Sequence, residues 1–94
     1  MKNHEFNDNT EAHNFEMFVD GQRSFIDYQK EGKLVYLLHT EVPEEQTGKG
    51  IAASLVEKTF HYLEKNELMA VPSCSYVRAF LKRHPEWERI VSEG

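Results

Sequence analysis

Short runs of aromatic and β-branched residues fill the first half of the chain and predict β-strands. Two such runs, residues 15–19 and 24–29, flank an Asp-Gly pair at residues 20–21, which favours a tight hairpin turn. A third run, residues 34–42, is the most apolar, and Pro43 is expected to terminate it. The pattern therefore predicts a three-stranded antiparallel meander.

The second half of the chain changes to helical spacing. Apolar residues recur three and four positions apart and predict an amphipathic helix over residues 48–65. A short apolar run at 68–71 predicts another strand, and an i, i+3, i+4, i+7 pattern from Val77 predicts a second helix that Pro85 ends. A strand, a crossover helix and a second strand form a right-handed unit with parallel strands.

These elements predict an α+β fold with a mixed, mostly antiparallel sheet and two main helices packed on it. With 94 residues the chain has room for one core, so residues 13–94 are predicted to form a single domain. Residues 1–12 are rich in Asn, Asp, Glu and His without apolar periodicity, and we expect a mobile tail there.

Composition and charge exclude several classes of function. Apolar residues make up 39% of the chain and charged residues 29%, as in ordinary globular proteins. The net charge of −5 argues against nucleic acid as a partner, and the longest apolar run, residues 34–38, is too short to span a membrane. We expect a cytoplasmic protein, because the first ten residues lack a secretory pattern and the lone Cys74 has no partner for an internal disulfide.

A glycine-rich turn at residues 48–50 joins the third predicted strand to the first helix. The first turn of a helix exposes unpaired N–H groups and the positive end of the helix dipole, and glycines let a phosphate approach them. Lys49 adds a cation beside this turn. The turn therefore predicts an anion site, although a turn that needs glycine only for its backbone angles is the alternative.

Two familiar phosphate motifs do not fit this turn. A Walker A loop needs a glycine five residues before its Gly-Lys pair and Ser or Thr after it, but Pro43 and Gly50 stand there. Residues 48–53 match the dinucleotide pattern G-x-G-x-x-A, but the next strand ends without the acidic residue that binds ribose.

Four motifs together carry a family resemblance. They are His-Thr-Glu-Val-Pro at 39–43, Thr-Gly-Lys-Gly-Ile-Ala at 47–52, Cys-Ser-Tyr-Val at 74–77 and Arg-His-Pro at 83–85. With them the chain resembles the GCN5-related N-acetyltransferases (GNAT), in the compact single-domain group of the YjdJ-like or N-acetyltransferase-domain-containing-1 type. The resemblance covers the chain from about Phe15 to His84.

The resemblance implies the α/β GNAT fold, in which the strand ending at Val42 splays from the strand near Val71. The slot between them takes the pantetheine arm of acetyl-CoA, which pairs with the backbone of Glu41 and Val42. The side chain of Gln46 is implied to lie beside the pyrophosphate, since Glu45 stands where the family carries Gln or Arg. The pyrophosphate itself is implied to bind the amides of Thr47, Gly48, Lys49, Gly50, Ile51 and Ala52.

Three side chains are candidates for the chemistry. His39 lies in the apolar strand and is a candidate base, although a merely hydrogen-bonded strand histidine is equally consistent with its position. Cys74 starts the second helix, where helix amides favour the thiolate, and the resemblance implies a catalytic role rather than simple packing. Tyr76 is a candidate acid for the leaving thiolate or an aromatic contact for the cofactor.

The sequence as a whole predicts an N-acetyltransferase that uses acetyl-CoA, with a primary amine of unknown identity as acceptor and with Cys74 and His39 as catalytic residues. No metal site or membrane partner is predicted, and the oligomeric state is left open. Two alternatives remain at this point: a non-catalytic module that binds CoA, and an adaptor that docks to another protein.

Overall fold

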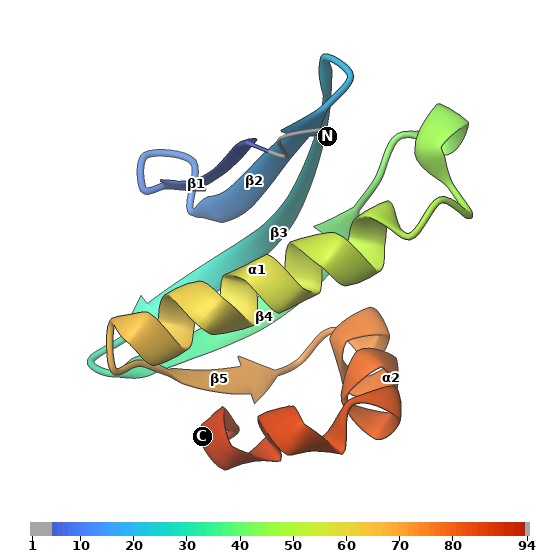
Figure 1. The fold of residues 1–94 in the computed structure, drawn as a ribbon. Helices are drawn as coiled ribbons and strands as arrows, with labels where there is room; N and C mark the ends of the chain where they lie inside the picture. The colour runs from blue at the N-terminus through green and yellow to red at the C-terminus, as the bar shows by residue number, and fades with distance from the viewer. Residues whose placement is uncertain (1–4, 94) are drawn as a thin grey trace.

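A five-stranded sheet in the order β1-β2-β3-β4-β5 forms the centre of the molecule in the computed structural model, which describes residues 5–93 (Figure 1). The first four strands are antiparallel neighbours, while β4 and β5 run parallel. The predicted mixed, mostly antiparallel sheet is therefore confirmed. The strands are β1 (Glu5–Asn9), β2 (Asn14–Val19), β3 (Gln22–Glu31), β4 (Leu34–Glu41) and β5 (Met69–Pro72).

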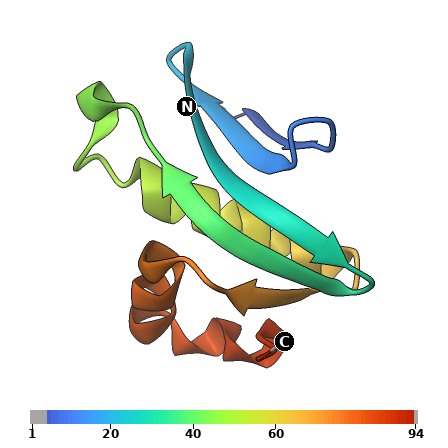
Figure 2. The same ribbon diagram turned by 180° about the vertical axis from the view of Figure 1, so that it is seen from behind.

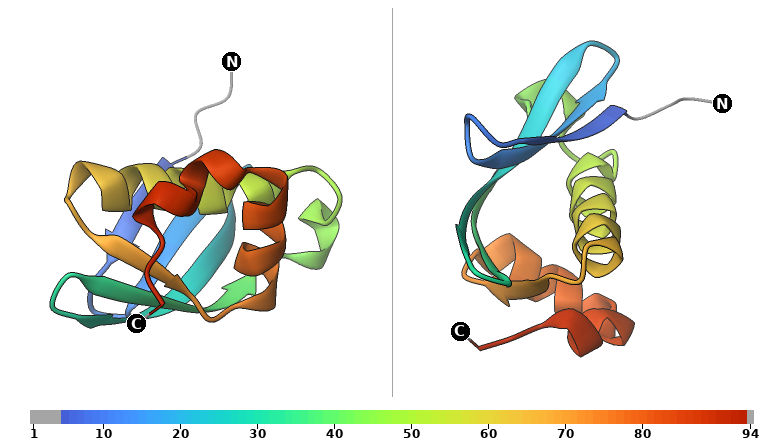
Figure 3. Two further views of the ribbon diagram at one scale, coloured as in Figure 1. Left: turned by 90° about the horizontal axis from the view of Figure 1, so that it is seen from below. Right: turned by 90° about the vertical axis from the view of Figure 1, so that its left-hand side faces the viewer.

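Helices cover one face of this sheet. Helix α1 (Ile51–Lys65) packs against β2, β3 and β5, and α2 (Ser75–Arg83) packs beside α1 against β4 and β5 (Figures 1 and 3). Two short 3₁₀ helices, η1 (Glu44–Gln46) and η2 (Pro85–Ile90), precede α1 and follow α2. In the part of the chain that the structure describes, the opposite face carries no helix, as the view from behind shows (Figure 2). None of the helices in residues 5–93 has the length and apolar character needed to cross a bilayer.

The predicted helical stripe forms the centre of the core. The stripe residues Leu55, Phe60 and Leu63 of α1 are fully buried against the sheet. The Phe60 ring also meets Phe80 of α2 edge-on, with 5.7 Å between ring centroids, and lies 5.5 Å from the Trp87 ring of η2. Such aromatic pairs add roughly 0.5–1.5 kcal/mol beyond area burial. Phe60 therefore joins α1, α2 and η2 in one core.

The predicted N-terminal tail needs correction. Residues 1–4 lie outside the described residues, but residues 5–9 form β1, which pairs with β2 along its whole length. Phe6 places its ring parallel to that of Phe15, at 6.0 Å between centroids. Single-domain organisation therefore begins at β1 rather than at residue 13.

An inward-facing carboxylate fastens β1 to the rest of the fold. Asp8 accepts hydrogen bonds from the hydroxyl of Tyr28 on β3 (2.6 Å) and from that of Tyr62 on α1 (2.9 Å). Burial and the bond to Asp8 raise the pKa of both tyrosines, so both hydroxyls stay protonated and serve as donors. Hydrogen bonds to a charged group contribute about 1.5–3 kcal/mol, which offsets the cost of turning a carboxylate inward.

A β-bulge in β4 decides which side chains face the helices. Tyr28 of β3 pairs with Leu37, and the preceding Asp27 pairs with His39, so Leu38 is the extra residue. Each strand residue points to the face opposite that of its neighbour, and one extra residue reverses the alternation beyond it. Thr40 therefore lies on the helix-covered face with Leu37, whereas His39 lies on the open face.

Strands β4 and β5 separate at one point along their length. Their parallel pairing runs from Leu34 with Met69 to Leu37 with Pro72 and stops there, although β4 continues to Glu41. Pro72 has no backbone N–H and cannot extend the ladder. The strands consequently diverge beside the N-terminus of α2, as the splayed pair in the predicted fold requires.

Candidate functional site

The first turn of α1 presents free backbone donors next to two glycines. Gly48 (φ 84°) and Gly50 (φ 76°) both adopt the left-handed region, and a Cβ at either would meet no atom within 4 Å. The first helical hydrogen bond runs from the N–H of Ser54 to the carbonyl of Gly50 at 3.0 Å. Three N–H groups at the start of the helix therefore have no acceptor within it. They belong to Ile51, Ala52 and Ala53.

A hollow of about 280 Å³ opens in front of these donors. We call it the loop hollow. Its neighbour Lys49 is exposed, and within residues 5–93 no carboxylate forms an ion pair with it. Free amides, space above the glycines and an unpaired cation fit a phosphate group. The lining residues are Val42, Gln46, Thr47, Gly48, Gly50, Ile51, Ala52 and Tyr76.

The side chain of Gln46 lines this hollow and also connects it to the neighbouring hairpin. It is only 4% exposed, and its Nε2 donates to the carbonyl of Val19 at 2.8 Å. Its Oε1 is buried and has no hydrogen-bond partner among the described residues. The hydrogen bond to Val19 holds η1 and the glycine turn against the β2–β3 hairpin. The contact of Gln46 with the pyrophosphate stays a prediction.

A cysteine and a threonine meet where β4 and β5 diverge. Cys74 is the N-cap residue of α2, and its Sγ lies 3.3 Å from Oγ1 of Thr40. Burial raises the pKa of the Cys74 thiol, but hydrogen bonds from the Thr40 hydroxyl and from the backbone N–H groups of Val77 and Tyr76 lower it by more. The net effect is a lowered pKa, so the thiolate is easier to form than in an ordinary cysteine.

The two predicted catalytic residues, Cys74 and His39, do not face each other. His39 lies on the open face of the sheet with its side chain 60% exposed, and its Nε2 is 2.5 Å from Oε1 of Glu41. The β4 bulge turns Thr40 toward Cys74 instead. His39 remains a candidate base only for a molecule that reaches the sheet from the open face.

A family profile described as GCN5-related N-acetyl-transferase matches residues 14–90. The chain belongs to this family. It is similar to Protein NATD1 of Bos taurus (36% identical over 64 residues, 67% of this chain) and of Danio rerio (39% over 62 residues, 63% of this chain). The match spans only 57% and 56% of the lengths of these relatives.

A solved structure supports the same fold for this GNAT chain. The NMR solution structure of a GCN5-like protein from Staphylococcus aureus superposes with a TM-score of 0.72, covering 98% of this chain and 91% of its own. Its sequence identity is 21%, so the likeness concerns the fold. The predicted GNAT architecture is confirmed by this match.

The remaining predicted residues of the GNAT site lie around the loop hollow. Val42 and Tyr76 line it, and each follows the Thr40–Cys74 contact by two residues. Glu41 ends β4 and is exposed, with its carboxylate on His39. The hollow therefore runs from the glycine turn to the neighbours of Cys74.

The Thr40 hydroxyl is expected to control the reactivity of Cys74. Thr40→Val removes a donor to the sulfur, so the pKa of the thiol should rise and less thiolate should be present at neutral pH. The rate of alkylation by iodoacetamide at pH 7 should fall about fivefold, because one hydrogen bond contributes about 1 kcal/mol. The difference should disappear at high pH, where both thiols are ionised.

Thr59→Val is the matched control for this experiment. Thr59 is buried in α1, and its hydroxyl has no hydrogen-bond partner among the described residues. Its loss should leave the alkylation profile unchanged. Equal profiles for Thr40→Val and the wild type would show that the hydroxyl does not act on the sulfur.

Proposed function

We propose that this chain is an acetyl-CoA-dependent N-acetyltransferase in which Cys74 carries the acetyl group to a primary amine. The observation that carries the proposal is the Cys74–Thr40 contact at the divergence of β4 and β5, with the loop hollow beside it. Membership of the GNAT family supports acetyl-CoA as the donor.

The residues of the loop hollow fit the anionic part of this donor. The free amides of Ile51 and Ala52 and the ammonium group of Lys49 would hold the pyrophosphate. The backbone of Glu41 and Val42 would hold the pantetheine arm along the edge of β4. Acetyl-CoA supplies an activated acetyl thioester there.

The chain's own groups then carry out two substitutions. The Cys74 thiolate attacks the acetyl carbonyl carbon, a new C–S bond forms, and the sulfur of CoA leaves as a thiolate that takes up a proton. An unprotonated amine next attacks acetyl-Cys74, the C–N bond forms, and the amine proton passes to solvent as the Cys74 thiolate leaves. Backbone amides at the N-terminus of α2 and the Thr40 hydroxyl stabilise that thiolate in both steps.

A screen for acetyl-dependent release of free CoA tests the proposal. Small primary amines, peptides with a free amino terminus and peptides that contain lysine are each incubated with acetyl-CoA. Alcohols and sugars of similar size are tested in parallel. We expect release above the hydrolytic background with amines, because an amine is the stronger nucleophile toward a thioester at neutral pH. Release with hydroxyl acceptors alone would contradict the proposed acceptor, and binding without release would leave a CoA-binding module.

A further inference from the structure

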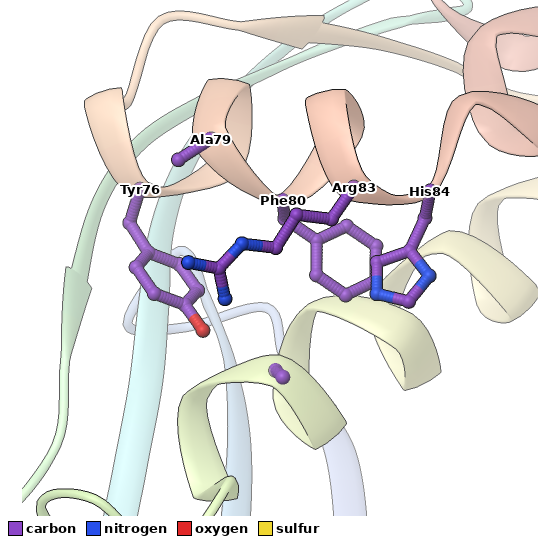
Figure 4. A pocket seen from close by; sticks show the side chains of 6 residues that line it. Tyr76, Ala79, Phe80, Arg83 and His84 are labelled. Carbon is purple, nitrogen blue, oxygen red and sulfur yellow. The ribbon is translucent and has the colours of Figure 1, made fainter.

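A second hollow lies between the first turn of α1 and helix α2. Its volume is about 100 Å³, and Tyr76 lines both this hollow and the loop hollow, so the two are neighbours. We call it the arginine hollow. Figure 4 shows its side chains on the side of α2 that faces α1. The lining residues are Ala53, Tyr76, Ala79, Phe80, Arg83 and His84.

The spacing along α2 explains how these side chains gather. Tyr76, Phe80 and Arg83 are separated by four and three residues, so they share one helix face. Phe80 is buried and forms the apolar floor, with the ring of His84 stacked on it at 4.4 Å between centroids. Tyr76 is 38% exposed, although large aromatic side chains usually bury more of their surface.

Arg83 gives this hollow a positive charge that is not neutralised by a neighbouring carboxylate of the described residues. The residue is exposed, and within residues 5–93 no carboxylate forms an ion pair with it. The Nδ1 atom of the neighbouring His84 lies 3.6 Å from Oε2 of Glu86. A planar guanidinium beside the exposed ring of Tyr76 is suited to a phosphate that is attached to a heterocyclic base.

We propose that the arginine hollow binds the 3′-phosphoadenosine end of CoA, with Arg83 on the 3′-phosphate and the exposed ring of Tyr76 against the adenine. This inference rests on the proposed function, because it needs the pyrophosphate in the loop hollow. In CoA the 3′-phosphoadenosine is joined directly to the pyrophosphate, so it must lie next to that group. A hollow of about 100 Å³ is far smaller than the roughly 300 Å³ of a site that encloses a small molecule, which suits one end group.

Titration calorimetry with CoA and 3′-dephospho-CoA tests this inference. The wild type should bind CoA more tightly, whereas Arg83→Gln should lose about tenfold in affinity for CoA and change less than about twofold for dephospho-CoA. Lys82→Gln is the matched control, since Lys82 is exposed on the same helix turn and does not line the hollow. Lys82→Gln should bind CoA more tightly than dephospho-CoA, by the same factor as the wild type.

The two ligands separate this inference from the function on which it rests. If the wild type binds CoA and dephospho-CoA equally well, Arg83 does not recognise the 3′-phosphate, and the proposed acetyl transfer still stands. If neither ligand binds, both proposals fail. An equal loss for both ligands in Arg83→Gln would overturn the assignment, because the arginine would then act on the pyrophosphate.

Discussion

Cys74→Ala is expected to lower kcat/KM for amine acetylation by at least about 100-fold while acetyl-CoA still binds. The variant lacks the nucleophile that we propose carries the acetyl group, and loss of a covalent nucleophile removes several kcal/mol of transition-state stabilisation. Wild-type protein incubated with acetyl-CoA alone should gain the mass of one acetyl group. Peptide mapping at mildly acidic pH should place that group on Cys74.

Binding to the variant is measured separately from turnover. Acetyl-CoA should raise the melting temperature of Cys74→Ala as much as that of the wild type, because the loop hollow does not include Cys74. Cys74→Ser keeps the size of the side chain and should be nearly as inactive, since a hydroxyl does not ionise near neutral pH. Normal turnover in Cys74→Ala would make the cysteine a packing residue. It would favour direct attack of the amine on acetyl-CoA, with water as base or with His39 as base for an amine that approaches from the open face of the sheet.

Gly50→Asp is expected to abolish the stabilisation of the fold by acetyl-CoA. A ligand at 100 times its Kd stabilises a protein by about 2.7 kcal/mol, which corresponds to roughly 10–20 °C in the Tm of a domain of this size. The substitution places a Cβ and a carboxylate in the open space above the first turn of α1. There the added charge would repel the pyrophosphate.

Gly32→Asp is the matched control for the same substitution. Gly32 also has a left-handed backbone (φ 60°) and open space where a Cβ would stand, but it lies in the β3–β4 turn at the far end of the sheet (Figure 1). The substitution should therefore strain the backbone to a similar degree in both variants. Only Gly50→Asp should lose the increase in Tm that acetyl-CoA produces. A full shift in Gly50→Asp would place the phosphates elsewhere.

The sequence predicted the elements whose apolar pattern is continuous. The stripe around Phe60 and the runs of β2 to β5 have clear periods, so their faces and order followed directly. Strand β1 has one apolar residue, Phe6, and its second inward residue is Asp8. Two hydroxyls satisfy that carboxylate from positions 20 and 54 residues away, on Tyr28 and Tyr62. No local pattern could reveal those partners.

The same limit explains the error at the candidate site. Simple alternation from Val35 and Leu37 places His39 inward, and only the extra residue Leu38 in the pairing with β3 turns Thr40 inward instead. A bulge has no reliable signature in a single strand, because it is a property of the pairing. The positions of the glycine turn and of Cys74 at helix starts could be predicted from sequence because they are local features, whereas the catalytic role of Cys74 was implied by the family resemblance and stays a prediction.

The bulge in β4 has a consequence for comparing this chain with other members of its family. Here the residue that faces the cysteine lies three positions after Leu37, the last buried leucine of the strand. In a relative whose strand has no bulge, the corresponding residue would lie two positions after that leucine. A gap-free alignment would then equate the inward residue of one protein with the outward residue of the other. Functional equivalence in this strand should therefore be assigned from sheet pairing, with a gap allowed at Leu38.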